Sequence, residues 1–325
     1  MNVDHDSKIS GLSRRSAFVK AAAITASGAV AASLAPASLA AAPAKTGKSG
    51  KSGSTITMKD GTQIYFKDWG TGPATFVFSH GWPLSSDAWE DQMMFLASNG
   101  FRCIAHDRRG HGRSSQPWDG NNYDTFAEDL ATIVDTLNVR NGIFVGHSMG
   151  GGEVARYLAK YGSARASKAV LLASVTPLML KTPANPEGTP MSAFDGIRAG
   201  LLADRAQFFK DLTTPFFGFN RSGIKDSQGR RDTFARLGMQ ASLRSTFECV
   251  KQFSEIDFSE DLKKISIPTL VIHGDDDQIV PIAASASNAV KLLKNGRLSV
   301  YKGAGHAIPQ MNKDQLNAEL LAFAK

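Results

Sequence analysis

Short apolar runs alternate with amphipathic stretches along most of the chain. The apolar runs have the length of buried strands and lie at residues 75–79, 101–107, 143–146, 169–173, 269–273 and 297–302. Stretches with helical spacing fall between or after them, at residues 86–98, 125–137, 150–161, 283–293 and 313–324. Strands that alternate with helices form βαβ units, so the pattern predicts an α/β fold with a mostly parallel central sheet flanked by helices. Residues 55–58 and 63–68 flank Lys59-Asp60-Gly61, which predicts a leading antiparallel hairpin.

One long segment, residues 177–262, interrupts this alternation. It contains no clear strand, but it has several amphipathic stretches and ten of the nineteen phenylalanines, including Phe208-Phe209 and Phe216-Phe217. We predict a helical cap inserted between late strands of the sheet. Most of its rings are expected to build the cap's own core, and a few to line an apolar pocket beneath it.

The strongest chemical signal is Gly146-His147-Ser148-Met149-Gly150, directly after an apolar run and before a helical stretch. A nucleophilic serine on a sharp strand-to-helix turn needs small neighbours, and Gly146 and Gly150 occupy those places. The start of the following helix also favours developing negative charge. The spacing predicts Ser148 as the nucleophile.

A serine hydroxyl becomes a good nucleophile when an imidazole takes its proton. Among seven histidines, His306 follows the last apolar run in a loop of small residues, Gly303-Ala304-Gly305, and comes after the serine in the chain order expected for this turn. We predict His306 as the base. His106 and His273 lie at strand ends, where a core role is the default, and His147 is expected to orient or pack beside the nucleophile.

The acid that orients the base should follow the run 269–273, where Asp275, Asp276 and Asp277 stand together. The residues alone leave the choice open, because the two other aspartates would serve as turn formers. An oxyanion formed during acyl transfer needs two backbone N–H donors. We assign these to Met149, which follows the nucleophile, and to Trp82 in the loop after the run 75–79.

Charge and cysteine content exclude several other classes. The formal charge of +7 comes from 37 basic and 30 acidic side chains, and without the first 44 residues, which carry four bases and two acids, it falls to +5. No basic stripe with interleaved aromatics is present, so a nucleic-acid partner is not expected. Cys103 and Cys249 are expected to be free, mostly buried thiols rather than a disulfide, and no spacing suggests a metal.

The first residues have the pattern of an export signal rather than of a folded segment. Residues 13–20, Ser-Arg-Arg-Ser-Ala-Phe-Val-Lys, precede an Ala-rich apolar stretch that ends in Ala-x-Ala-like sites. They resemble a twin-arginine signal, with one extra residue between Arg15 and Phe18. The alternative is a membrane anchor, but Ser, Gly and Pro interrupt the stretch. We predict a signal at 1–44, a Gly/Ser/Lys linker at 45–54, and one folded domain at 55–325, exported to the periplasm or secreted without stable membrane insertion.

Taken together, several motifs in the body resemble the α/β-hydrolase superfamily, and more narrowly the cofactor-free bacterial haloperoxidases (perhydrolases) and aryl esterases. The motifs are His80-Gly81-Trp82-Pro83, residues 107–114, 146–152 and 273–281, and Gly305-His306. The resemblance implies Asp277 as the triad acid, an oxyanion N–H from Trp82, and pocket walls at Trp82, Val280 and Ile282. It also implies an enzyme without metal or other cofactor that acts on small or aryl esters and, with hydrogen peroxide, forms peracids from the ester or the carboxylic acid.

Other activities remain open at this point. A serine at position 148 argues against haloalkane dehalogenases and epoxide hydrolases, which would carry an aspartate there. Lactonases, carbon–carbon hydrolases and hydroxynitrile lyases keep the serine, so the triad does not separate them. A non-catalytic ligand-binding protein on this fold is a further alternative, although such proteins usually lose a triad member.

Overall fold

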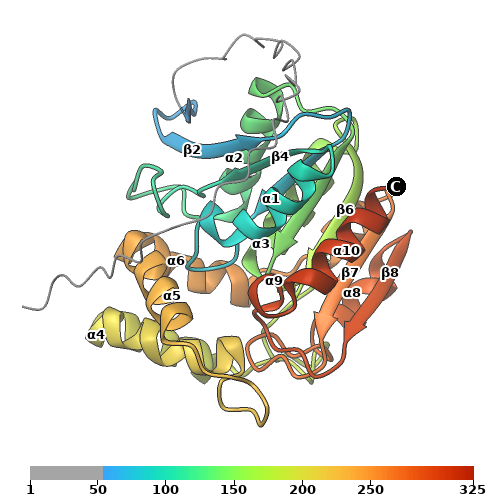
Figure 1. Ribbon diagram of the computed structural model, residues 1–325. Coiled ribbons are helices and arrows are strands. Elements are labelled where there is room, and N and C mark those ends of the chain that lie inside the picture. Colours follow the sequence, from blue (N-terminus) through green and yellow to red (C-terminus); the bar gives the residue numbers. More distant parts are fainter. Residues whose placement is uncertain (1–53) are drawn as a thin grey trace, which may run out of the picture. The chain divides into compact units, whose positions relative to one another are not determined.

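The computed structural model describes residues 54–325, which fold around one eight-stranded sheet (Figure 1). The strand order is β1-β2-β4-β3-β5-β6-β7-β8. The strands are β1 (Thr55–Thr57), β2 (Gln63–Trp69), β3 (Thr75–Ser79), β4 (Arg102–His106), β5 (Gly142–His147), β6 (Ala166–Leu172), β7 (Thr269–Gly274) and β8 (Gly296–Tyr301). Strand β2 pairs antiparallel with both β1 and β4, and the remaining pairings, from β4 across to β8, are parallel. The predicted α/β architecture with a leading hairpin is confirmed.

Helices cover both faces of the sheet, which is why its central strands are apolar on both sides. All six residues of β5 are buried, and so are all five of β3. One core cluster packs α1 (Glu90–Ser98) and α10 (Lys313–Ala324) against one face. The other contains α2 (Tyr123–Thr136), α3 (Met149–Tyr161) and α8 (Ala286–Leu292). Two apolar cores therefore hold the sheet from opposite sides.

The cap is inserted between β6 and β7, as the segment without strands indicated. It consists of α4 (Met191–Phe217), α5 (Gln228–Gln240) and α6 (Leu243–Glu255), and α7 (Ser259–Lys264) leads back to the sheet. In Figure 1 these three helices, coloured yellow to orange, stand together at one end of the sheet. Ser227 and Ser242 begin α5 and α6 by accepting a backbone N–H with their hydroxyl groups. The cap therefore meets the sheet at the end where the parallel strands finish.

Some elements differ from the predictions in their bounds. The stretch 86–98 divides into a 3₁₀ turn, Ser86–Trp89, and helix α1. The long helix α4 is kinked at Asp204, whose φ of −155° and ψ of 89° are not helical. The Asp204 carboxylate accepts the N–H of Gln207 at 2.9 Å, so the second half of α4 starts with an N-cap of its own. The short helix α9 (Ile308–Met311) was not expected.

Two predictions lie outside the described residues: the export signal at 1–44 and the linker at 45–54, of which only Ser54 is described. Within residues 54–325, no helix combines the length and the hydropathy that a membrane span needs. Cys103 in β4 and Cys249 in α6 are buried and free, as expected.

Candidate active site

Ser148 stands on the turn between β5 and α3 with a φ of +55° and a ψ of −120°. L-residues seldom adopt this conformation, so the surroundings must hold it in place. A Cβ on Gly146 would lie 2.3 Å from the Gly150 carbonyl oxygen, and a Cβ on Gly150 would lie 2.1 Å from the Ser79 carbonyl oxygen. Only glycine fits at either position. The two glycines therefore allow the strained turn that presents the Ser148 hydroxyl at the end of the sheet.

His306 and Asp277 meet beside this turn. The His306 Nδ1–H donates to Asp277 Oδ2 at 2.7 Å, and both side chains are buried. Asp277 Oδ1 accepts the backbone N–H groups of Ile279 and Val280, each at 2.9 Å. With the proton on Nδ1, His306 Nε2 is free to take a proton. Ser148 and His306 line the same pocket. No hydrogen bond joins their side chains, and such bonds often tighten only when substrate binds.

A second histidine also contacts the triad acid. His273 Nε2 lies 3.3 Å from Asp277 Oδ2 and 2.8 Å from the Val280 carbonyl oxygen. Burial alone would raise the pKa of Asp277, but the charges and hydrogen bonds of His306 and His273 outweigh it and hold this pKa well below its usual range. Asp277 therefore stays ionised and stabilises a protonated His306.

The two neighbouring aspartates have different partners. Asp275 accepts the backbone N–H of Gly303 at 2.6 Å, in the loop that leads to His306, so it ties two loops together instead of forming the local turn expected of it. Asp276 instead forms an ion pair with Arg221, after the last turn of α4, at 2.7 Å. It is therefore a contact between core and cap rather than a turn former. Of the three candidates, only Asp277 contacts His306.

The two predicted oxyanion donors come from separate segments of the chain. The Met149 N–H opens α3, where it has no helical partner, and the Trp82 N–H follows β3. Within residues 54–325, neither N–H finds a protein acceptor. The loop carrying Trp82 is held close, because a Cβ on Gly81 would lie 3.2 Å from Ser148 Cβ. Both groups are thus free to donate to an oxyanion at Ser148.

The catalytic pocket is a small apolar cavity of about 240 Å³ above Ser148 and His306. Trp82 and Val280 line it, as predicted, together with the cap residues Phe194 and Phe253. Ile282 does not line it. Its side chain packs against the main core cluster, and Ile279 lines the pocket in its place. The prediction for Ile282 was wrong because the turn that follows Asp277 directs positions 279 and 280, and not 282, at the pocket.

A buried polar network supports the loop after β3, which carries the Trp82 N–H. Glu153 on α3 accepts Arg108 Nε at 2.6 Å and Ser79 Oγ at 3.0 Å, and His106 Nε2 lies 2.8 Å from it. Arg108 in turn donates to the His80 carbonyl at 2.9 Å. Burial raises the pKa of Glu153, but Arg108 and His106 overcome this and lower it to about 2. A fully buried ion pair thus fixes the loop that carries the Trp82 N–H.

His147 holds the loop of the catalytic base. Its Nε2–H donates to the His306 carbonyl at 3.0 Å, and the two rings lie 4.9 Å apart. Burial lowers the pKa of His147 to about 3, so the ring is neutral at ordinary pH. The sequence placed His147 beside the nucleophile without a partner. The position of His147 next to the serine was the only sequence signal for its contact with the His306 carbonyl.

This arrangement is that of a serine hydrolase: a strained nucleophile, a buried Asp–His pair and two free backbone donors. A family model described as "alpha/beta hydrolase fold" matches residues 74–309. The chain belongs to the α/β-hydrolase family, within the group of non-heme haloperoxidases and related esterases.

Individual relatives support this narrower group. The chain is 52% identical to a non-heme haloperoxidase of Rhodococcus erythropolis, over 82% of this chain and 98% of that one. It is 46% identical to the bifunctional esterase/perhydrolase DCH of Acinetobacter calcoaceticus, over 83% and 99%. A crystal structure of a bromoperoxidase from Bacillus anthracis is similar at 38% identity and a TM-score of 0.77, over 81% and 95%. The match covers the body of the chain but not its first residues.

Residues 54–325 contain no group of three or more His, Cys, Asp or Glu side chains placed to hold a metal ion. The absence of a cofactor stays a prediction from the resemblance.

Proposed function

We propose that the protein is a serine esterase that also acts as a perhydrolase, in which one acyl-serine intermediate serves both reactions. The relatives named as haloperoxidase and as esterase/perhydrolase support this, and so does the complete set of hydrolase groups at Ser148. The single observation that carries it is the buried His306–Asp277 pair in the pocket of a strained serine.

In the first half-reaction, Ser148 Oγ attacks the ester carbonyl carbon while His306 Nε2 takes its proton. Asp277 stabilises the resulting imidazolium, and the N–H groups of Met149 and Trp82 hold the oxyanion. The bond from carbon to the alcohol oxygen then breaks, and His306 returns the proton to that oxygen. The alcohol leaves, and the acyl group stays on Ser148.

The second half-reaction decides the product. Water attacking the acyl-enzyme releases the carboxylic acid, whereas hydrogen peroxide releases the peracid, with His306 taking the proton in both cases. The same acyl-enzyme also forms from a carboxylic acid with loss of water. The free peracid transfers an oxygen atom to bromide or chloride and takes up a proton, which gives the hypohalous acid and returns the carboxylic acid.

Labelling with a fluorophosphonate tests this assignment. We expect the reagent to add once to the wild-type protein and on Ser148, as shown by mass spectrometry of peptides. The Ser148→Ala protein should take up none. Labelling at another residue, or unchanged hydrolysis of aryl acetates after complete labelling, would contradict the assignment.

For its location, we propose export by the twin-arginine route. The residues Ser13-Arg14-Arg15-Ser16-Ala17-Phe18 and the Ala-rich stretch after them support this. Replacing Arg14 and Arg15 by lysine should trap the full-length precursor inside the cell. Fractionation of producing cells, with the mass of the protein measured by mass spectrometry, tests this. Processed protein outside the cytoplasm in the double variant would argue against the route.

A further inference from the structure

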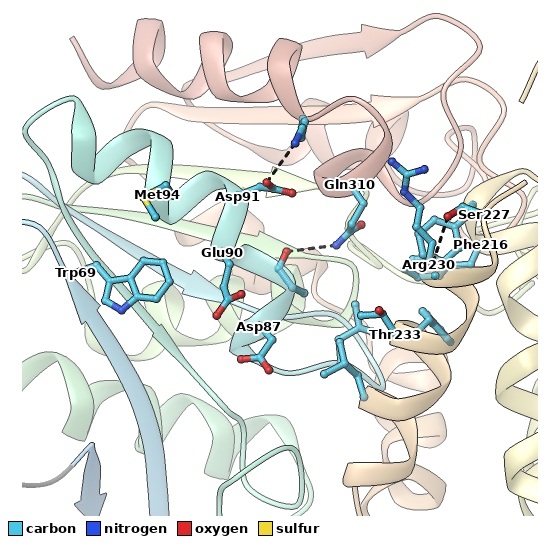
Figure 2. A pocket seen from close by; sticks show the side chains of 17 residues that line it. Trp69, Asp87, Glu90, Asp91, Met94, Phe216, Ser227, Arg230, Thr233 and Gln310 are labelled. Atoms are coloured by element: carbon cyan, nitrogen blue, oxygen red, sulfur yellow. Dashed lines mark hydrogen bonds and ion pairs between the residues drawn. The ribbon is translucent and has the colours of Figure 1, made fainter. Parts of the chain in front are cut away.

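A second and larger cavity lies between the cap and the sheet domain. This outer cleft, of about 760 Å³, opens between the segment 87–94 on one side and α5 on the other. Its apolar lining comes from both sides: Trp69, Leu84, Ala88, Met94, Phe216, Phe217, Phe234 and Leu237. Figure 2 shows Phe216 and Thr233 facing Asp87 and Glu90 across this space. The cleft has the size of a ligand site, which usually falls between about 300 and 1,000 Å³.

The acidic side chains at the rim of the outer cleft are already paired. Asp91 pairs with Lys313 at 3.3 Å, and Asp87 and Glu90 both pair with Lys67. Asp87 also meets Arg113 at 2.5 Å. The carboxylates thus offer little free charge to a ligand. Arg230 also lines the cleft, and its guanidinium has no ion-pair partner within residues 54–325. A ring-lined floor beside a cation favours an aromatic group, because the face of a ring attracts a cation.

Phe216 is the wall that the outer cleft and the catalytic pocket share. It lines both cavities, it is only 2% exposed, and its ring lies edge-on to the His306 ring with centroids 5.1 Å apart. Phe234 and Phe217 hold the ring from the side of the cleft, at 4.6 and 5.1 Å. A turn of this one side chain would join the cavities beside the catalytic base.

The chemistry of acyl transfer indicates which half of an ester would extend from the catalytic pocket into the outer cleft. His306 must reach the oxygen of the departing alcohol, because that oxygen receives its proton. The leaving group therefore extends along the His306 side of the site, where Phe216 stands. The catalytic pocket, at about 240 Å³, lies below the usual size of a ligand site and suits a short acyl chain.

We propose that the outer cleft is the leaving-group subsite, that it takes an aryl group, and that Phe216 is the gate to it. This inference rests on the proposed esterase function. It assigns the acyl group to the pocket lined by Phe194, Ile197 and Phe253, and the aryl alcohol to the cleft lined by Phe217, Phe234 and Leu237. The two halves of the substrate would then be selected by different residues.

The main test fills the cleft without touching the catalytic groups. Thr233 lies on α5, is exposed and lines the cleft, so Thr233→Trp places a large ring there. The matched control is Met239→Trp, which adds the same side chain to an exposed position of α5 outside the cleft. Each variant is assayed with phenyl acetate, 2-naphthyl acetate and phenyl butyrate, and ratios of kcat/KM are compared.

We expect Thr233→Trp to lower the 2-naphthyl to phenyl acetate ratio about tenfold, because a ring in the cleft excludes the larger leaving group. The phenyl butyrate to phenyl acetate ratio should stay within about twofold, and Met239→Trp should change neither ratio. An unchanged leaving-group ratio in Thr233→Trp, or a change in the acyl ratio instead, would overturn the proposal.

Two further variants separate the gate from the acyl pocket. Phe216→Ala should raise the leaving-group ratio about fivefold, whereas Ala193→Trp, in the catalytic pocket, should lower only the acyl ratio. If Phe216→Ala raised the acyl ratio alone, Phe216 would be an acyl wall and not a gate. Failure of the esterase function itself is distinguishable, because the wild-type protein would then hydrolyse none of the three esters.

Discussion

The sheet core and the cap contribute two different kinds of wall to one catalytic pocket. From the core come Ser148, His306 and Val280, set by hydrogen bonds and a buried ion pair beneath them. From the cap come side chains that are only apolar, such as Phe194 and Phe253. Hydrogen-bonded groups have few alternative positions, whereas packed rings tolerate replacement. Changes in the core should therefore affect rate and stability, and changes in the cap should affect substrate choice.

The largest difference should come from the acid of the triad. Asp277→Asn keeps the acceptor for the Ile279 and Val280 N–H groups but presents an amide to His306, which favours the wrong tautomer. We expect kcat for phenyl acetate to fall about 10⁴-fold. Asp276→Asn is the matched control, since it loses only a partly exposed pair with Arg221, and should stay within about twofold. Equal effects of the two variants would contradict the assignment of the acid.

The next prediction concerns the buried ion pair of the core. Glu153→Gln keeps the shape of the side chain but leaves the Arg108 charge buried without its partner. We expect the free energy of unfolding to fall by about 3–5 kcal/mol, measured by urea denaturation. The control is Glu128→Gln, which removes an exposed pair with Lys160 and should change stability by at most about 1 kcal/mol. A Glu153→Gln protein as stable as this control would show that the network is dispensable.

Replacing His111 should have a smaller effect on stability, and this effect should depend on pH. Burial lowers the pKa of His111 to about 4, whereas in the unfolded chain it is about 6.5. As the pH falls from 6.5 toward 4, only the unfolded chain takes up this proton, so stability is lost in that window. His111→Asn keeps the donor to the Arg109 carbonyl, which His111 Nδ1 contacts at 3.0 Å.

We therefore expect the loss of stability between pH 7 and pH 5 to be about 2 kcal/mol smaller in His111→Asn than in wild type. Urea denaturation at both pH values measures it. A parallel loss in the two proteins would mean that His111 takes up its proton in the folded state as well.

The smallest effect should come from the cap. Phe253 contacts the Trp82 ring at 5.4 Å and lines the catalytic pocket. Phe253→Leu should lower the free energy of unfolding by less than about 1.5 kcal/mol. The space it frees should raise kcat/KM for phenyl butyrate relative to phenyl acetate about fourfold, the equivalent of one buried methylene. A loss of rate for both esters alike would mean that the cap takes part in the chemistry and not only in the choice of substrate.

Local patterns in the sequence were enough to predict the central strands and most site residues. Ser148 was found because glycines must flank a strained turn, and the structure shows the close contacts that exclude any larger residue at 146 and 150. His306 was found from chain order and a loop of small residues. The acid was different: three adjacent aspartates are equivalent in composition, so only the family resemblance pointed to Asp277, and the fold shows that this one contacts His306.

What the sequence did not reveal depends on contacts between distant segments. The network of Glu153, Arg108 and His80 joins α3 to two loops, and no periodicity marks such a set. The cap helices lacked clear bounds because their signals, serine caps and one kink at Asp204, are local and weak. Ile282 was placed in the pocket by resemblance, but the turn after Asp277 brings Ile279 there.

The most direct test of whether one acyl-serine serves both reactions is a paired assay of metal-stripped wild type and Ser148→Ala. It follows hydrolysis of an aryl acetate, and bromination in acetate buffer with hydrogen peroxide. We predict that wild type performs both reactions and that Ser148→Ala loses both, with hydrolysis falling on the order of 10⁶-fold, because one acyl-serine serves both. Bromination that survives in Ser148→Ala would contradict the account, since the halogenation would then not be serine chemistry.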